Sequence, residues 1–512
     1  MAKICLCLTA KTIGRNLEIL SKYRQSADLA ELRVDCLDSD ERLLIRRFPE
    51  LAGLPVILTI RRDIDGGHFS GGEGARVKLM ARGLAFANED SRHNFAYVDI
   101  EDDLVVPSLE EAARTFGTRI IRSCHNLNGI IDDIPAKIKF MQRSVDEIAK
   151  VAVSVKSSGD VLRVFRASKA CAGQDKILIC MGHFGVCSRI LAERFGSFLT
   201  YASALYENEI PGASGQMDVQ ELAYLYRFRR ITKKTKVYGI TGFPLNASIS
   251  PWFFNNIFCL ENSDMVYVPF PADSVPELLE LVEELNVQGL SVTVPYKEAI
   301  LPFLSKSSQM VQSVGACNTL IHTDEGWYGE NTDCTGFSDS LLNFLGEKNL
   351  KNYKITIIGS GGVARAAAAE IFRLKGKALI LNRSVHKARN VASQYKFRWG
   401  GLDSAGMEVM SKYSDVIIQA SSAGMEGHDK SDPAELFKFT GKEAVMDLIY
   451  TPAVTPFLAR AAAAGCRTIN GYDMVIRQAC LQFSHYIGRE IPQQFLSRIM
   501  AGENIWNRIQ TG

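Results

Sequence analysis

The chain has 512 residues, more than one hydrophobic core usually serves, so at least two domains are expected. Its composition is that of a globular protein, with 46% hydrophobic and 23% charged residues, and its net charge of +2 does not favour nucleic acid or an acidic surface as a partner. No apolar run approaches the roughly 18 residues of a membrane span, and the N-terminal run is too short and strand-like for a signal peptide. Twelve cysteines without a C-x-x-C pair favour free thiols, and together these features predict a cytoplasmic enzyme.

Eight short apolar runs recur through the first part of the chain, mostly separated by stretches with helical apolar spacing. Strands that alternate with helices in this way predict an α/β fold with an eight-stranded parallel barrel, the (β/α)8 or TIM barrel. The runs occupy residues 3–10, 29–36, 55–62, 95–102, 118–126, 148–155, 176–182 and 198–204.

The sixth run contains a lysine, Lys150, within a sequence typical of a strand buried on both faces. A buried ammonium is costly unless it is paired, and burial lowers the pKa of a lysine. A neutral amine can attack a ketone and form a protonated imine, which acidifies the neighbouring carbon. His125, about one strand–helix–strand step earlier, can take that proton and return one to a leaving hydroxyl. Lys150 and His125 are therefore predicted to face one cavity.

Further polar residues in or just after the predicted strands would complete this cavity, because function in a barrel gathers at the carboxyl ends of the strands. Glu101 is expected to orient His125, and Arg189 is expected to hold a substrate carboxylate through its planar fork. Each residue alone could instead be a structural ion pair or, for His125, a core histidine. The other members of the set are Glu31, Arg33 and Arg61.

These motifs resemble the type I 3-dehydroquinate dehydratases over about residues 3–225. The resemblance rests on ELRVD, TIRR, VDIED, RSCHN, AKVAV, MGHFGVCSR and GASGQ, in this order. It implies that Lys150 forms a Schiff base with the substrate and that His125 is the general acid and base. It further implies four residues that hold the substrate: Arg33, Arg61, Arg189 and Gln216. Ser214 stands where the family commonly has proline. This difference is expected to affect the stiffness of a closing loop but not the chemistry.

Residues 227–236, RFRRITKKTK, contain six basic residues and no acid. A phosphate-binding patch is one interpretation. A solvated linker is the favoured one, because the pattern of strands changes at this point.

A glycine-marked unit begins at residues 354–372, within a pattern that predicts a doubly wound sheet. Residues 359–364 fit the dinucleotide fingerprint G-x-G-x-x-A between a strand and a helix, where a pyrophosphate rests on the helix N-terminus. The next strand ends at Arg383 without the acid that usually binds the ribose of NAD, which favours NADP, although an ordinary exposed residue is the alternative. The predicted cofactor residues are Gly359, Ser360, Gly361, Gly362, Val363, Ala364, Asn382, Arg383, Ser384, Lys387, Ser421 and Gly471.

Upstream of this unit, Lys297 follows a strand and a proline turn, and Asp333 lies in a polar stretch. Ser248 and Ser250 share one side of an extended segment and would suit a carboxylate, with a turn before Pro251 as the plain alternative. A reduced ketone needs a cation and a proton beside its oxygen; Lys297 can supply both, and Asp333 can position it.

These stretches resemble the shikimate dehydrogenases over about residues 236–508, through ASISP, VTVPYK, GACNTL, ENTDCTGF, GSGGVAR, NRS, ASSAGM and RQACLQF. The resemblance implies reduction of 3-dehydroshikimate to shikimate with NADPH, with Lys297 and Asp333 as the catalytic pair. Ala247 stands where relatives often have histidine. Lys387 replaces a frequent second arginine and lacks its planar fork, so the preference for NADP is expected to be weaker. The implied substrate residues are Ser248, Ser250, Thr293, Asn318, Tyr450 and Gln478.

The product of the first implied reaction is the substrate of the second, so the chain is predicted to be a bifunctional enzyme of the shikimate pathway. Two alternatives stay open: a second domain that uses quinate, and a metabolite-sensing regulator, which would have lost catalytic residues. Small molecules are the expected partners, without nucleic acid, membrane or metal, and such a chain could work as a monomer. The predicted domains are 1–226 (barrel), 227–236 (linker), 237–335 completed by 485–512 (substrate binding) and 336–484 (NADP binding).

Overall fold

The computed structural model describes residues 1–85, 90–205, 207, 214–245, 248–427 and 429–501. Its contacts divide the chain into two compact units. The first combines Met1–Gly239 with Phe254–Val287, and the second combines Ile240–Phe253 with Gln288–Met500. Within the described ranges, no helix is both long and apolar enough to pass through a bilayer.

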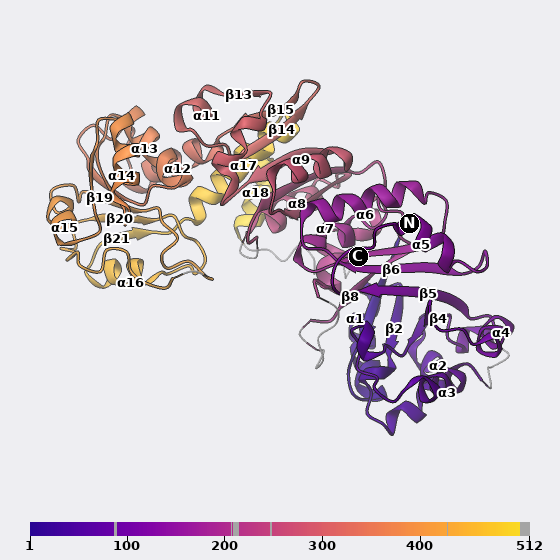
Figure 1. The fold of residues 1–512 in the computed structure, drawn as a ribbon. Coiled ribbons are helices and arrows are strands. Elements are labelled where there is room, and N and C mark those ends of the chain that lie inside the picture. Colours follow the sequence, from indigo (N-terminus) through magenta and orange to yellow (C-terminus); the bar gives the residue numbers. More distant parts are fainter. Residues whose placement is uncertain (86–89, 206, 208–213, 246–247, 428, 502–512) are drawn as a thin grey trace. The chain divides into compact units, whose positions relative to one another are not determined.

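The first sheet contains the eight predicted strands and a short ninth, all parallel, in the order β7-β6-β5-β4-β3-β2-β1-β8-β9. A parallel bridge from Lys176 to Ser197, at the start of β8, joins the two sides of the sheet, so the strands curl into the predicted barrel (Figure 1). The strands are β1 (Lys3–Leu8), β2 (Leu29–Arg33), β3 (Val56–Thr59), β4 (Tyr97–Glu101), β5 (Arg119–Asn126), β6 (Ile148–Ser154), β7 (Lys176–Met181), β8 (Leu199–Ser203) and β9 (Met217–Asp218).

Helices alternate with these strands, and polar side chains begin several of them. Thr12, Asp133 and Ser157 each accept a hydrogen bond from a backbone N–H in the first turn of the helix that follows. These caps explain where α1, α5 and α6 start. The helices are α1 (Ile13–Tyr23), α2 (Phe48–Ala52), α3 (Glu73–Leu84), α4 (Pro107–Thr115), α5 (Ile134–Met141), α6 (Ser158–Ala170) and α7 (Val186–Ile190).

The inner face of the barrel changes from apolar to polar along the strands. On β5, Ile121 belongs to a buried apolar cluster, and the next two residues on the same face are Ser123 and His125. On β6, Ile148 is followed on that face by Lys150, which is in register with Ser123. The alternation of a strand thus places the lysine in the interior, as predicted.

A second sheet of six strands has the order β11-β10-β12-β14-β15-β13. Sequence analysis missed the antiparallel hairpin of β14 and β15, in which Thr323 pairs with Gly326 across the turn. Gly326 has a φ of 106°, which glycine adopts easily. The strands are β10 (Lys236–Gly242), β11 (Met265–Pro271), β12 (Val287–Val292), β13 (Lys306–Ser307), β14 (Thr319–Thr323) and β15 (Gly326–Glu330). The helices are α8 (Ser250–Leu260), α9 (Val275–Glu284), α10 (Tyr296–Ala299), α11 (Gln309–Val314) and α12 (Thr332–Leu345).

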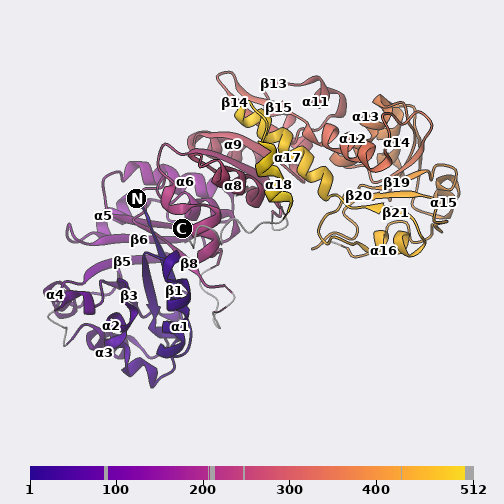
Figure 2. The same cartoon turned by 180° about the vertical axis from the view of Figure 1, so that it is seen from behind.

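The third sheet is parallel, with the order β18-β17-β16-β19-β20-β21, the doubly wound order of dinucleotide-binding folds. Helices α13 and α14 lie on one side of the sheet and α16 lies on the other (Figures 1 and 2). A separate apolar core fills the space between the helices and the sheet on each side. The strands are β16 (Lys354–Ile358), β17 (Lys377–Leu381), β18 (Arg398–Gly400), β19 (Val416–Gln419), β20 (Ala444–Asp447) and β21 (Arg467–Ile469). The helices are α13 (Gly362–Arg373), α14 (Val385–Gln394), α15 (Ser404–Met410), α16 (Pro456–Ala463), α17 (Tyr472–Ile487) and α18 (Gln493–Met500).

The basic stretch 227–236, predicted to be a solvated linker, is solvated only in part, because four of its six basic residues are exposed. Arg227 and Phe228 are buried, and Nη1 of Arg227 donates to the carbonyl oxygens of Phe258 at 2.9 Å and Ser263 at 3.1 Å. The charge of Arg227 is therefore used to bind two backbone carbonyl groups. The four predicted domain boundaries remain a proposal.

Two candidate active sites

Lys150 is paired inside the barrel. Its Nζ lies 2.8 Å from Oδ2 of Asp99 on β4 and 4.5 Å from the ring centre of Tyr201 on β8. Lys150 is 6% exposed and Asp99 1% exposed, so the carboxylate and the ring together offset the cost of burying the ammonium. Sequence analysis missed Asp99, although it precedes Glu101 by two positions and therefore shares its face of the strand.

Asp99 is the centre of a buried network. Its carboxylate also accepts from Nη2 of Arg61 at 2.8 Å and from Oγ of Ser123 at 2.5 Å. Burial alone would raise the pKa of Asp99, but the charges of Arg61 and Lys150 hold that pKa far below its usual range. Asp99 therefore stays ionised and holds the amine of Lys150 in place.

His125 lies on the inner face of β5, one position along that face from the partner of Lys150. Burial lowers its pKa well below the usual value, and the positive charges of Arg61 and Lys150 lower that pKa further. Its Nδ1 is buried and has no hydrogen-bond partner among the described residues. The imidazole is therefore neutral, with the properties of a general base.

Glu101, which was predicted to orient His125, forms no hydrogen bond with that histidine among the described residues. Its two carboxylate oxygens accept from Nη1 of Arg61, at 2.6 Å, and from Nη1 of Arg76 on α3. Arg76 is fully buried, and nothing in its helical sequence context marks it as part of a site. Since two guanidinium groups occupy the carboxylate, Glu101 holds Arg61 in position instead.

Arg189, on α7, is a buried cation that has no carboxylate partner among the described residues. Nη2 donates to the carbonyl oxygen of Ser214 at 3.2 Å, Nη1 lies 3.5 Å from that of Tyr201, and Nε has no partner among the described residues. Burial lowers the pKa of Arg189 to about 10. A buried guanidinium with a free donor is suited to bind an anion, which agrees with the predicted carboxylate site.

Two further predicted residues, Arg33 and Glu31, already have polar partners. Both carboxylate oxygens of Asp35 accept from Arg33, at 2.9 and 2.7 Å. Glu31 accepts from Thr59 at 2.9 Å and from Sγ of Cys7 at 3.2 Å.

Gln216 completes this wall of the barrel. Its Oε1 accepts from Ser203 at 2.5 Å, and its Nε2 donates to Sγ of Cys7 at 3.2 Å. Cys7, on β1, thus connects Glu31 with Gln216. Sequence analysis missed it because a cysteine within an apolar run reads as core.

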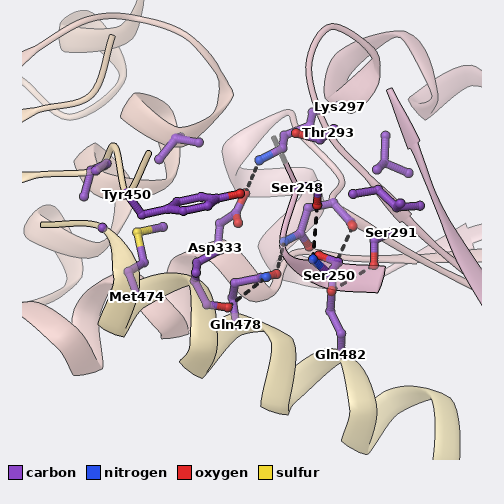
Figure 3. Close-up of a pocket in the computed structure, with 17 residues that line it drawn as sticks. Ser248, Ser250, Ser291, Thr293, Lys297, Asp333, Tyr450, Met474, Gln478 and Gln482 are labelled. Atoms are coloured by element: carbon purple, nitrogen blue, oxygen red, sulfur yellow. Dashed lines mark hydrogen bonds and ion pairs between the residues drawn. The ribbon is translucent and has the colours of Figure 1, made fainter. Parts of the chain in front are cut away.

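The second candidate site is a cavity of about 150 Å³ in the second unit (Figure 3). Lys297, from α10, and Asp333, from the first turn of α12, are both buried there, with 2.6 Å between Nζ and Oδ2. The N-terminus of α12 favours the negative charge of Asp333. The structure brings all the predicted substrate residues to this cavity: Ser248, Ser250, Thr293, Asn318, Tyr450 and Gln478.

A polar network from α17 forms one wall of the cavity (Figure 3). Gln478 accepts from Nδ2 of Asn318 at 3.4 Å, and one turn later Gln482 accepts from Oγ of Ser291 at 2.8 Å. Met474 also lines the cavity from this helix. Sequence analysis missed Ser291, Met474 and Gln482, although glutamines four residues apart share one face of a helix.

The two serines lie at the start of α8. Oγ of Ser248 accepts from the backbone N of Ser250 at 3.3 Å, so Ser248 also forms the turn that was the alternative interpretation. Tyr450 is largely buried, which raises the pKa of its hydroxyl. Ala247, where relatives often have histidine, lies outside the described residues.

The glycine-rich turn after β16 fits a dinucleotide. Gly359 has a φ of 123°, and a Cβ there would lie 2.7 Å from the carbonyl oxygen of Ala420, so only glycine fits. A Cβ on Gly361, the N-cap of α13, would meet no heavy atom within 4 Å. The turn thus leaves open space at a helix N-terminus, at the carboxyl end of β16 where the strand order reverses. Ser360 and Ala364 lie in the same turn and first helical turn, and Val363 reaches the cavity.

The other predicted cofactor residues surround this end of the sheet. No acid follows β17: Asn382 donates to the carbonyl oxygen of Ser384 at 3.2 Å, and Arg383 is exposed, as is Lys387. Neither cation forms an ion pair within the described part of the chain. Ser421 follows β19, with its N–H donating to Gln419 at 2.7 Å, and Gly471 lines the cavity. These residues could hold a 2′-phosphate without a competing carboxylate.

Comparisons with known proteins also divide the chain into a part with the barrel site and a part with the second site. Residues 4–233 match a family model described as type I 3-dehydroquinase, 240–320 match the shikimate dehydrogenase substrate binding domain, and 343–452 match shikimate/quinate 5-dehydrogenase. The chloroplastic bifunctional 3-dehydroquinate dehydratase/shikimate dehydrogenase of Arabidopsis thaliana is 28% identical over 97% of this chain and 84% of its own. The shikimate dehydrogenase (NADP(+)) of Carboxydothermus hydrogenoformans is 32% identical over 52% of this chain and 98% of its own. A solved structure, dehydroquinate dehydratase and shikimate dehydrogenase from S. pombe AroM, is 23% identical over 98% of both chains, with a TM-score of 0.42.

Proposed function

Since the chain belongs to the shikimate dehydrogenase family and carries a type I 3-dehydroquinase domain before that part, we propose that it is a bifunctional enzyme of the shikimate pathway. It dehydrates 3-dehydroquinate and reduces the product, 3-dehydroshikimate, to shikimate with NADPH. The observation that carries the proposal is a buried lysine–carboxylate pair in each half of one chain, Lys150–Asp99 and Lys297–Asp333.

In the barrel, Lys150 loses its proton and the neutral amine attacks the substrate ketone, which forms an imine and releases water. Neutral His125 removes a proton from the carbon next to the imine, and the same histidine returns it to the leaving hydroxyl, which departs as water. Hydrolysis of the imine consumes a water and restores Lys150, so the net change is the loss of one water. Arg189 would hold the carboxylate of the substrate, and Asp99 would stabilise the positive charge of the protonated imine.

Trapping with borohydride tests the imine. Reduction in the presence of 3-dehydroquinate should convert the imine into a stable amine and attach the carbon skeleton of the ligand to Lys150, as mass spectrometry of peptides would show. Lys150→Arg is the matched control, since arginine keeps the charge and forms no imine. A label on another lysine, or none in the wild type, would sink the mechanism.

In the second site, NADPH would supply, when bound, the hydride that reduces the ketone of 3-dehydroshikimate. Lys297 stabilises the developing alkoxide and donates a proton to it, and Asp333 holds the ammonium in position through the 2.6 Å contact. The hydroxyls of Ser248 and Ser250 would hold the carboxylate. The glycine turn at 359–362 and the exposed Arg383 and Lys387 would hold the pyrophosphate and the 2′-phosphate.

A regulator without turnover is the weaker candidate, because Lys150, His125, Lys297 and Asp333 are all present in arrangements suited to catalysis. Quinate as the second substrate is also weaker, because both Ser248 and Ser250 line the cavity. An assay with purified chain, 3-dehydroquinate and NADPH should yield shikimate. Failure of either step, or faster oxidation of quinate than of shikimate with NADP, would contradict the proposal.

We also propose that the enzyme acts in the cytoplasm and works as a monomer. Each candidate site is formed by residues of a single chain, which supports the proposal of a monomer. Cell fractionation and light scattering of the purified chain test these two points. A compartment other than the cytoplasm is the competing outcome of the first test, since the Arabidopsis relative is chloroplastic.

A further inference from the structure

Gly362, the first residue of α13, lies directly against the side chain of Lys297. A Cβ built on Gly362 would be 3.3 Å from Cδ and 3.6 Å from Cβ of the lysine. The first distance is shorter than the roughly 3.5–4.0 Å at which carbon atoms pack without repulsion. Any side chain at this position would therefore press on the methylene groups of Lys297.

Lys297 has little freedom to yield to such pressure. Its Nζ is bound to Asp333 at 2.6 Å, and its carbonyl oxygen accepts from the N–H of Cys317 at 2.7 Å (Figure 3). The lysine is thus held at its backbone and at its end, with Gly362 against the part between them. A displacement of the methylene groups must change the contact between Nζ and Asp333.

A second contact joins the same two helices. Nη2 of Arg365 lies 3.2 Å from Oε2 of Glu298, the residue that follows Lys297 on α10. Gly362 and Arg365 are three residues apart and therefore lie on one face of α13. The first turn of α13 consequently contacts both Lys297 and its neighbour.

We propose that the first turn of α13 positions the catalytic lysine of the dehydrogenase site, with Gly362 as the main positioning residue and the Arg365–Glu298 ion pair as its support. The role of Lys297 in this statement rests on the proposed function. The same helix N-terminus that would receive the pyrophosphate then also fixes the proton donor. The side chain of Lys297 favours a glycine at residue 362, and the backbone of the loop that follows β19 requires one at residue 359.

Two alanine variants separate this role from cofactor binding. Gly362→Ala should lower kcat for reduction of 3-dehydroshikimate by about tenfold or more, because displacements below 1 Å in a reacting geometry reach that size. Its KM for NADPH should change by a smaller factor than its kcat, although Gly362 also lies in the turn that would hold the pyrophosphate. In Gly361→Ala the added Cβ would contact no other protein atom, so this variant should mainly change the KM for NADPH. The reverse pattern, or equal effects on kcat and KM in both variants, would overturn the proposal.

A measurement without cofactor or substrate gives an independent readout. Competitive labelling of the apoprotein with acetic anhydride, followed by peptide mass spectrometry, reports how readily the amine of Lys297 reacts. Labelling should increase several-fold in Gly362→Ala, because its contact with Asp333 is disturbed, and should stay at the wild-type level in Gly361→Ala. Unchanged labelling of Lys297 in Gly362→Ala would contradict the positioning role even if turnover fell.

Arg365→Gln covers the case in which Gly362→Ala does not fold. Because the ion pair with Glu298 is partly exposed, its loss should raise labelling of Lys297 by no more than about fivefold. If labelling of Lys297 did not increase in this variant, the ion pair would have no part in positioning the lysine. If the wild-type chain did not reduce 3-dehydroshikimate, the proposed function would fail, whereas the labelling comparison would still decide whether α13 positions Lys297.

Discussion

At the scale of single residues, both candidate sites show a lysine that is buried and paired with one carboxylate. The sequence of β6 predicts a buried Lys150 but not its partner, and the partner decides its behaviour. Asp99 keeps the amine in a fixed place, and Tyr201 covers it with an aromatic ring. The amine that would attack the ketone is therefore held in place before the substrate enters.

The pH dependence of dehydration tests the state of His125. Burial and the charges of Arg61 and Lys150 lower its pKa, so the imidazole stays neutral at pH values where an ordinary histidine, with a pKa of about 6.5, becomes protonated. We expect kcat/KM for 3-dehydroquinate to fall on the acid side with an apparent pKa below 6.5, because the base works only when it is neutral. A profile from about pH 4.5 to 9 measures this, and an acid limb at or above 6.5 is the contrary result.

Arg383 gives a prediction about the cofactor. Its replacement by alanine should raise the KM for NADPH by about 10- to 100-fold, since a charge-assisted hydrogen bond to a phosphate contributes about 1.5–3 kcal/mol. The KM for NADH should change little, because NADH has no 2′-phosphate. Lys387→Arg should lower the KM for NADPH by restoring a planar fork. Equal changes for both cofactors would show that Arg383 is an ordinary exposed residue.

At the scale of elements, apolar runs predicted all eight barrel strands, because each run is buried on both faces and bounded by helices. The hairpin of β14 and β15 was missed, because its short strands are partly exposed and give weaker apolar runs. The partner of Glu101 could not be predicted either. Arg76 reaches it from α3, and no sequence pattern shows which helical arginine will turn inward to a strand. A single sequence does not show which side chains of distant elements contact one another.

The end of β20 gives a prediction about stability. Asp447 accepts from Oγ1 of Thr455 at 2.6 Å and from the N–H of Ile449 at 2.9 Å, and thereby holds the segment that carries Tyr450. Burial raises the pKa of Asp447 from 3.8 to about 6. The folded protein therefore binds this proton more tightly than the unfolded chain does. The resulting stability is present below about pH 4 and is lost as the pH rises through about 6.

Comparison with Asp447→Asn measures this contribution. The free energy of unfolding of the wild type, relative to the variant, should decrease by about 2 kcal/mol between pH 4 and pH 7. Urea unfolding at several pH values, followed through the transition of the second unit, gives the difference directly. A difference that does not change with pH would show that Asp447 titrates alike in both states.

At the scale of the whole molecule, each compact unit contains one complete lysine site. Lys297→Ala should therefore lower the rate of 3-dehydroshikimate reduction by about 100-fold or more. Dehydration should continue, so that 3-dehydroshikimate accumulates. Lys150→Ala should block the first step and leave reduction of added 3-dehydroshikimate intact. Separate assays of both steps on each variant measure this, and parallel loss of the two activities would mean that the sites are not separable.

Arg189 links supply of substrate to the survival of the enzyme. Among the described residues its guanidinium contacts carbonyl oxygens and no carboxylate, so part of the cost of burying the cation is not offset. A substrate carboxylate that pairs with Arg189 offsets this cost and binds only the folded barrel, which shifts the folding equilibrium toward the native form. In a cell, the barrel would then resist heat and proteases best while dehydroquinate is plentiful. The amount of enzyme would rise and fall with the flow of metabolite that it processes.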